Sequence, residues 1–246
     1  MASSVHHAAV RSSRRQGVLI ACLTRDQRYN ALDRGTLRAL LRLLQRERTA
    51  GGPLVLTGSG PLFSVGPDIA ELAALDGEAA ASYSRLGHEV VEAIEAWPGP
   101  TLAWLQGYCL GSALELALAC DVLTGTEDLR LGLPGLAWAM VPCMGGLRRL
   151  SMRVGSESAT RLFLSGDVIN GRQARAQGLL NRLVPDPGDA ERLALEIDEL
   201  GLSAVLAMRQ MRLHQLGPQD HEAEVALFAQ PFATGECQRR LRQLLA

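Results

Sequence analysis

One glutamate stands out as a group that could carry chemistry. Glu115 lies within Gly111-Ser112-Ala113-Leu114-Glu115-Leu116-Ala117-Leu118-Ala119-Cys120, where almost every neighbour is apolar. A carboxyl group in such surroundings is either buried or directed into a pocket, and loss of water raises its pKa toward neutrality. Glu115 is therefore a candidate general acid or base. The alternatives are a structural carboxylate satisfied by partners and one exposed on a helix edge, and spacing alone does not decide between them.

Backbone N–H groups beside this run form a second candidate feature. Gly107, Gly111 and Ser112 precede or begin the apolar segment. Amides at a helix start lack intrahelical acceptors and can hold a carbonyl oxygen or an oxyanion. The alternative is a tight connection without a ligand, which is the commoner use of a glycine-rich turn.

The sequence lacks the patterns of several other enzyme classes. No G-x-S-x-G elbow, P-loop or G-x-G-x-x-G fingerprint occurs, which argues against a hydrolase, an NTPase or a dinucleotide enzyme. The five cysteines are widely spaced and form no C-x-x-C pair, so we expect no metal site and a reducing, cytoplasmic location. His6 and His7 are interpreted as surface residues.

Charge and hydropathy exclude two kinds of partner. The 246-residue chain has a formal net charge of −1, and all 25 of its basic residues are arginines. This balance argues against a surface for nucleic acid or an anionic membrane. No apolar run approaches the roughly 18 residues of a membrane span.

Strands and helices must alternate to position these groups. The pattern predicts strands at residues 17–23, 54–57, 101–105 and 122–124, and helices from 36, 69–75, 78–96 and 110–120, with Asp33 and Asp68 as caps. This order favours a parallel sheet with crossover helices in one main domain. We expect a flexible tail over residues 1–16, a core over 17–195 and a helical region over 196–246.

Several segments resemble, in order and spacing, the blocks of the crotonase (enoyl-CoA hydratase/isomerase) superfamily. The matching segments are Leu23-Thr24-Arg25-Asp26-Gln27-Arg28-Tyr29-Asn30-Ala31-Leu32, Phe63-Ser64-Val65-Gly66-Pro67-Asp68-Ile69, Gln106 to Asp121, Leu133-Pro134-Gly135 through Leu150, and Ser165-Gly166-Asp167 with Ala174 and Gly178-Leu179. The resemblance implies the crotonase (ClpP-like) α/β spiral of ββα units with a C-terminal helical region. It covers about residues 18–184.

The resemblance also implies an acyl-thioester site with an altered oxyanion hole. Two backbone N–H donors of the family map to Pro67 and Ser112; proline has no N–H, so one donor is lost unless a shifted loop supplies another. The two family glutamates map to Glu115 and Gly135, so the second carboxylate is missing. Trp138 is expected to fill the vacated volume. Asp128, Tyr83, His88 and Arg85 are conceivable substitutes.

Further positions follow the family pattern for substrate binding. We expect contacts to CoA or to the acyl group from Arg25, Arg28, Ser64, Val65, Gly66, Asp68, Gly111, Gly135 and Trp138. The substrate carries its own CoA or phosphopantetheine arm, on CoA or an acyl-carrier protein, and no separate cofactor is implied. A homotrimer or dimer of trimers is also implied by the resemblance.

Two functions remain open at this stage. The first is an enzyme that dehydrates, isomerises or decarboxylates an acyl thioester through an enolate, with Glu115 as acid or base and Ser112 N–H as donor. The departures at Pro67 and Gly135 favour a specialised role, such as tailoring in polyketide biosynthesis, over standard hydration. The second is a non-catalytic acyl-CoA-binding protein with the same fold.

Overall fold

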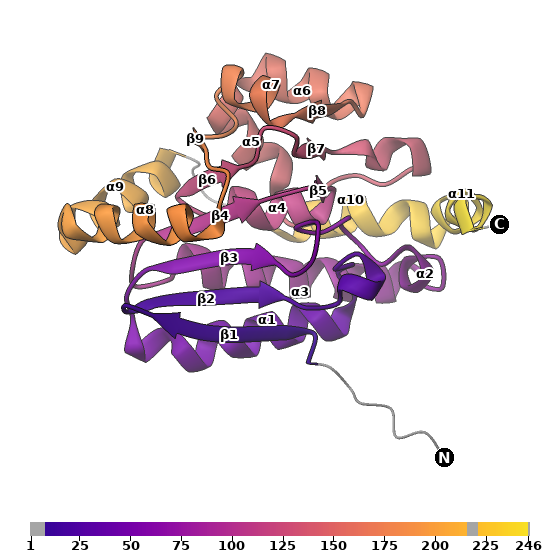
Figure 1. The fold of residues 1–246 in the computed structure, drawn as a ribbon. Coiled ribbons are helices and arrows are strands. Elements are labelled where there is room, and N and C mark those ends of the chain that lie inside the picture. The colour runs from indigo at the N-terminus through magenta and orange to yellow at the C-terminus, as the bar shows by residue number, and fades with distance from the viewer. Residues whose placement is uncertain (1–7, 216–220, 246) are drawn as a thin grey trace.

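The computed structural model describes residues 8–215 and 221–245, which form two β-sheets wrapped by helices (Figure 1). The larger sheet has the order β1 (Val10–Arg15), β2 (Val18–Leu23), β3 (Leu54–Gly58), β4 (Thr101–Leu105), β6 (Val122–Gly125) and β9 (Arg182–Leu183). The smaller sheet has the order β5 (Tyr108–Leu110), β7 (Arg130–Gly132) and β8 (Val168–Asn170). From β2 to β9 the larger sheet is parallel. This matches the predicted crotonase fold class.

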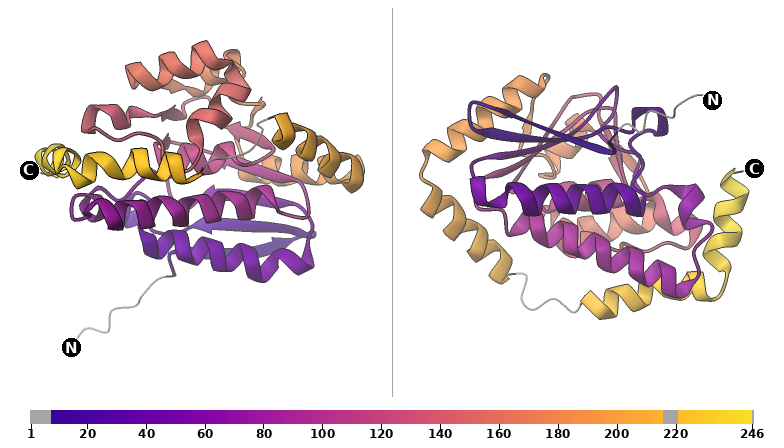
Figure 2. Two further views of the ribbon diagram at one scale, coloured as in Figure 1. Left: turned by 180° about the vertical axis from the view of Figure 1, so that it is seen from behind. Right: turned by 90° about the horizontal axis from the view of Figure 1, so that it is seen from below.

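Helices connect the strands and cover both faces of the larger sheet. The helices are α1 (Arg34–Glu47), α2 (Ile69–Leu72), α3 (Gly77–Glu95), α4 (Ser112–Leu118), α5 (Gly146–Val154), α6 (Ser156–Ser165), α7 (Gly171–Ala176), α8 (Pro187–Glu199), α9 (Leu202–Gln215), α10 (His221–Ala233) and α11 (Glu236–Leu245). Short 3₁₀ turns occur at η1 (Asp26–Arg28), η2 (Arg48–Ala50) and η3 (Pro134–Trp138). Helices α1 and α3 pack on one face of the sheet, as the two views of Figure 2 show. Helix α8 packs on the other face.

The apolar patterns determine which faces are buried. Strands β3 and β4 are buried at every position, as expected for central parallel strands covered on both sides. Helix α1 buries the leucines 37, 40, 43 and 44, which recur at helical spacing. Its predicted cap is present, because Asp33 accepts the Thr36 N–H at 2.6 Å.

The predicted flexible tail is wrong over the part of it that forms β1. Val10–Arg15 pairs antiparallel with β2 along its whole length. Gln16 and Gly17 have positive φ values of 50° and 87°, the conformation of a tight hairpin turn. Five of the six β1 residues are exposed, so no apolar alternation marked the strand in the sequence. Residues 1–7, including His6 and His7, lie outside the described residues.

Two other boundaries differ from the prediction. The apolar helix expected over 110–120 is limited to α4, because Leu110 ends β5 and Gly111 has a φ of 53°. The expected border between core and helical region at residue 196 falls inside α8. Helix α8 in fact belongs to the core, since Ala190 and Ala194 pack with Val18 and Trp104.

The C-terminal helices return to the core. Helix α10 packs along α3, and α11 packs beside α2, so the end of the chain lies against its first half (Figures 1 and 2). No helix within the described ranges combines the length and apolarity required to cross a bilayer.

Candidate active site

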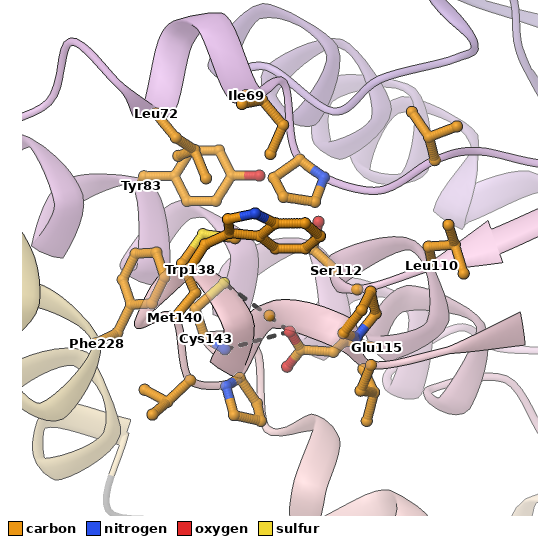
Figure 3. A pocket seen from close by; sticks show the side chains of 18 of the residues that line it. Ile69, Leu72, Tyr83, Leu110, Ser112, Glu115, Trp138, Met140, Cys143 and Phe228 are labelled. Atoms are coloured by element: carbon orange, nitrogen blue, oxygen red, sulfur yellow. Dashed lines mark hydrogen bonds between the residues drawn. The ribbon is translucent and has the colours of Figure 1, made fainter. Parts of the chain in front are cut away.

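An apolar cavity of about 160 Å³ lies where the first half of the core meets the C-terminal helices (Figure 3). Its walls come from the 65–67 loop, α2, α3, α4, η3, the 140–143 segment, α6, α10 and α11. The lining residues are Val65, Pro67, Ile69, Leu72, Tyr83, Leu110, Gly111, Ser112, Glu115, Leu133, Pro134, Gly135, Trp138, Met140, Val141, Pro142, Cys143, Phe163, Phe228 and Leu244. Among these described residues, Glu115 is the only carboxylic acid.

The two glycine-bearing segments of the sequence lie beside each other at this cavity. Ser64 N–H donates to Tyr108 O at 2.9 Å, and Leu110 N–H donates to Ser64 O at 3.2 Å. At Gly66, whose φ is 92°, an added Cβ would lie 2.3 Å from Leu110 O. Glycine is therefore required there, because any side chain would push the loop away from β5.

Three backbone amides hold the Glu115 carboxylate. Cys143 N–H donates to Oε1 at 3.2 Å, and Met144 and Gly146 N–H donate to Oε2 at 2.9 Å each. A Cβ at Gly146 would lie 2.4 Å from Glu115 Cγ, so this approach requires glycine. The turn 143–146 and α4 therefore fix the carboxylate in one orientation at the cavity wall (Figure 3).

The surroundings of Glu115 bring its pKa close to neutral pH. The side chain is only 2% exposed. Burial raises the pKa of Glu115 to about 7, and the negative charge of Glu224 raises it as well, while the three N–H donors act in the opposite direction. A carboxyl group with a pKa near 7 can both accept and return a proton at physiological pH.

Helix α10 contributes a second acid close to the same turn. Glu224 Oε1 accepts the Gly145 N–H at 2.6 Å, between the amides that hold Glu115. Burial raises the pKa of Glu224. Glu224 lies outside the cavity lining, and it acts on the site through its hydrogen bond to the turn and through its charge, which raises the pKa of Glu115.

Ser112 begins α4 and faces the cavity. Gly111 N–H donates to Gly132 O at 3.0 Å, which fixes the entry to the helix. Ser112 N–H is at the first helical position and has no acceptor within the helix. It is therefore open to a ligand oxygen in the cavity, and its role as an oxyanion donor stays a prediction.

The 64–68 loop offers no amide at the position of the second donor. Pro67 has no N–H, and its neighbours are engaged: Gly66 N–H donates to Ser64 Oγ at 3.1 Å, and Asp68 N–H to Leu32 O at 3.1 Å. Val65 N–H donates to Tyr29 O at 3.2 Å. A shifted loop donor, one of the sequence alternatives, is not formed in this structure.

The remaining predicted binding residues divide between the cavity and its supports. Val65, Gly111, Gly135 and Trp138 line the cavity, whereas Ser64, Gly66, Asp68, Arg25 and Arg28 do not. Ser64 Oγ bridges Asn30 O and Gly66 N–H, and Asp68 caps α2. Arg25 forms ion pairs with Asp33 and Asp68 at 2.8 and 3.3 Å. Arg28 is exposed on η1, and its contact with CoA stays a prediction.

The position of the missing second carboxylate is tightly enclosed. A Cβ on Gly135 would lie 3.0 Å from Met140 O, closer than most side chains approach backbone. Trp138, on the same 3₁₀ turn, presents its ring to the cavity (Figure 3). Trp138 therefore shapes this wall in place of a second acid.

Of the four conceivable substitutes, only Tyr83 reaches the cavity. Its hydroxyl donates to Leu32 O at 3.0 Å, and burial raises its pKa well above the ordinary value, so it is a poor acid. Asp128 is exposed, and Arg85 forms an ion pair with Glu222 at 2.8 Å. His88 is buried between α3 and α10, and burial, with the nearby His221 and Arg149, lowers its pKa to about 4.

Several site residues were not anticipated from the sequence. The amides of Cys143 and Met144 form part of the Glu115 cradle, and the Gly145-Gly146 pair was the signal that could have identified it. Glu224, Phe228 and Leu244 come from the C-terminal helices, where no local pattern marks them. No cluster of metal-ligating side chains occurs within residues 8–215 and 221–245.

Comparison with known proteins assigns the family. Residues 13–241 match the family model of enoyl-CoA hydratase/isomerase. The chain is 35% identical over 175 residues to the 2,3-dehydroadipyl-CoA hydratase of Escherichia coli, covering 70% of this chain and 68% of that one. It superposes on an enoyl-CoA hydratase of Thermoplasma volcanium with a TM-score of 0.82 at 26% identity, covering 96% and 97% of the two chains. An enoyl-CoA hydratase/isomerase of Mycobacterium paratuberculosis shares the fold, with a TM-score of 0.88 at 23% identity and coverages of 96% and 98%. The chain thus belongs to the enoyl-CoA hydratase/isomerase family of the crotonase superfamily.

Proposed function

We propose that this protein binds an acyl thioester, on CoA or a carrier protein, and moves a carbon–carbon double bond in its acyl chain. The observation that carries the proposal is that Glu115 is the only carboxyl group among the described residues that line a mainly apolar cavity. Double-bond migration needs one group that takes a proton from one carbon and returns it to another. A carboxyl with a pKa of about 7 suits both steps.

The proposed reaction balances with Glu115 alone. The carboxylate removes a proton from Cα of a 3-enoyl thioester, and the electron pair enters a dienolate whose negative charge rests on the thioester oxygen. The protonated Glu115 then returns the proton at Cγ, which gives the conjugated 2-enoyl thioester. Ser112 N–H hydrogen-bonds the thioester oxygen in the dienolate, which lowers the barrier because the donor is already oriented.

Two other reactions fit this cavity less well. Hydration needs a second acid or base to share the work at the neighbouring carbon, and the Gly135 position carries none. Decarboxylation needs a cation or several donors to hold a substrate carboxylate, and no Arg or His is found among the described lining residues. Apolar walls instead suit a hydrocarbon acyl chain.

The test compares isomerisation and hydration in the same samples. A 3-enoyl-CoA is incubated with the protein, and 2-enoyl-CoA and 3-hydroxyacyl-CoA are separated and quantified over time. We expect 2-enoyl-CoA to accumulate faster than the hydrated product. Glu115→Gln should abolish the formation of 2-enoyl-CoA. Glu89→Gln, which removes an exposed acid on α3, serves as the matched control and should keep the activity. Hydration at the rate of isomerisation would refute the single-carboxyl mechanism.

A second candidate, non-catalytic acyl-CoA binding, is favoured by one observation. Glu115 accepts from three backbone amides and from the Cys143 thiol, and such a set of protein donors would also suit a structural carboxylate. This function predicts stabilisation by acyl-CoA without turnover of any enoyl substrate, and equal affinity in Glu115→Gln. Turnover that depends on Glu115 would exclude it.

The oligomeric state, the cellular location and the pathway of this protein are also proposals. We propose a homotrimer or a dimer of trimers in the cytoplasm, in a specialised pathway. Large apolar side chains at Leu200, Met208 and Met211 are at least 60% exposed on and near α9, which is consistent with a subunit contact. Light scattering of the purified protein measures the assembly directly.

A further inference from the structure

The side chain of Ser112 is buried yet forms no hydrogen bond. Ser112 is 3% exposed, and its Oγ has no partner among the described residues. The Ser112 side chain acts to lower the pKa of Tyr83, against the larger rise caused by burial, and the Tyr83 hydroxyl donates its own proton to Leu32 O at 3.0 Å. The two hydroxyls do not form a well-aligned bond. A buried hydroxyl without a partner destabilises a fold, so its presence at a cavity wall points to a partner that is absent here.

The cavity is the direction in which such a partner can lie. Ser112 lines it together with Glu115 and Trp138, and all three side chains face the same space (Figure 3). Apart from Ser112, the polar side-chain groups of this lining are the Glu115 carboxyl, the Tyr83 hydroxyl, the Trp138 indole N–H and the Cys143 thiol. The first two are engaged, by the 143–146 turn and by Leu32 O, and the Cys143 thiol donates to Glu115 Oε1 at 3.9 Å. Ser112 Oγ is thus a hydroxyl donor that a ligand could use without breaking a protein hydrogen bond.

Pro67 lines the same cavity, next to the residue that precedes Ser112. Its ring is packed against the start of α4, because a Cβ on Gly111 would lie 3.3 Å from Pro67 Cδ. The amides on both sides of Pro67 are committed to Ser64 Oγ and Leu32 O. Pro67 and the two amides that flank it therefore offer no free backbone donor beside Ser112.

We propose that the Ser112 hydroxyl donates the second hydrogen bond to the thioester carbonyl oxygen, in place of the amide that Pro67 lacks. This inference rests on the proposed enolate chemistry. The backbone N–H and the side-chain Oγ–H belong to the same residue, Ser112, so a single oxygen can accept from both. The apolar walls of the cavity give it a low local dielectric constant. Both donors therefore interact more strongly with the negative charge that develops on the oxygen.

The proposal makes opposite predictions for activity and for stability. Ser112→Ala should lower kcat/KM for isomerisation about 100- to 1,000-fold, the usual loss for one oxyanion donor. The same substitution should leave the urea midpoint unchanged or raise it, because it removes an unsatisfied buried group. Ser112→Thr keeps the hydroxyl and should retain more activity than Ser112→Ala. A hydroxyl with a purely structural role would lower stability and activity together.

A double-mutant cycle tests whether Ser112 substitutes for the missing amide. Pro67→Ala restores an N–H at the cavity wall and should raise kcat/KM in the wild-type background. In the Pro67→Ala background, Ser112→Ala should cost at least about tenfold less than in the wild type, because the two donors serve the same oxygen. Pro61→Ala, in an exposed turn away from the cavity, controls for loss of a proline. If Ser112→Ala lowered kcat/KM by the same factor in both backgrounds, the idea that Ser112 replaces the missing amide would be overturned.

A measurement without turnover separates this inference from the proposed reaction. The infrared carbonyl stretch of a 2-enoyl-CoA labelled with ¹³C at the thioester carbon reports hydrogen bonds to that oxygen when the ligand is bound. We expect a shift to lower frequency in the wild type that is smaller in Ser112→Ala and unchanged in Pro61→Ala. If turnover is absent but this shift depends on Ser112, only the proposed reaction fails. An identical stretch in wild type and Ser112→Ala would overturn the inference even if isomerisation is observed.

Discussion

The raised pKa of Glu115 predicts a specific pH dependence of folding stability. In the unfolded chain the carboxyl has its ordinary pKa of 4.5, and burial in the folded protein raises it to about 7. The folded state therefore binds a proton more tightly than the unfolded state. This contribution to stability is complete below about pH 4.5 and is lost as pH rises through about 7.

The magnitude follows from the size of that shift. A rise from 4.5 to about 7 is worth about 3 kcal/mol, at roughly 1.4 kcal/mol per pKa unit. Glu115 is almost completely buried, so screening by solvent does not reduce this figure much. His88 acts in the opposite sense, since its pKa is lowered to about 4 and its contribution is lost as pH falls. The wild-type profile alone therefore mixes the two groups.

Comparison of variants isolates the contribution of Glu115. Urea unfolding of wild type and Glu115→Gln is measured at about pH 5 and about pH 8, with Glu89→Gln as the control for loss of one negative charge. The free energy of unfolding of the wild type, relative to Glu115→Gln, should fall by about 2–3 kcal/mol between the two pH values. The contribution of His88 cancels because both proteins contain it. A difference that stays constant within about 0.5 kcal/mol, or that rises with pH, would refute the raised pKa.

Three further substitutions test other parts of the structure. Gly135→Glu should not produce efficient hydration and should destabilise the fold, because its Cβ would meet a backbone oxygen at 3.0 Å; hydration assays and urea unfolding would show this, and a fast hydratase would contradict it. Asp121→Asn should lower the free energy of unfolding by about 3–5 kcal/mol, since it leaves the buried Arg209 guanidinium without its anionic partner; a loss below about 1 kcal/mol would show that the ion pair is dispensable. Glu224→Gln removes a negative charge that raises the pKa of Glu115, so the acidic limb of the pH–rate profile should move to lower pH; no movement, or movement upward, would contradict the coupling.

Local sequence patterns were sufficient to predict the helices and strands that form the core. The leucine spacing of α1 and the aspartate caps at residues 33 and 68 predicted helices that the structure confirms. The central strands are apolar along their length because helices cover both faces. These signals are local in sequence, and tertiary packing did not override them.

Strand β1 and the support of Glu115 were not predictable in this way. Strand β1 is an exposed edge strand, held by pairing with β2 rather than by its own apolar pattern. The Glu115 cradle joins α4 to a turn about 30 residues later, and Glu224 reaches that turn from α10. Contacts of such long sequence separation depend on the path of the whole chain, which no local motif encodes.

The candidate site was predicted in outline and corrected in detail. Glu115, Ser112, Trp138 and Gly135 line one cavity, and their roles toward a substrate stay predictions. From the sequence, Ser112 was predicted to act only through its backbone N–H. Whether its side chain has a hydrogen-bond partner can be seen only in three dimensions. Its unpartnered hydroxyl is the feature that the structure adds.

Proton exchange at Cα of a bound acyl thioester tests the central claim most directly. A saturated acyl-CoA is incubated with the protein in deuterated water, its binding is confirmed by calorimetry, and its mass is followed with time. The account predicts that deuterium enters at Cα with the wild type and with Glu89→Gln, and that Glu115→Gln prevents this exchange. A thioester that binds the wild type without exchanging its Cα protons would contradict the assignment of Glu115 as the base.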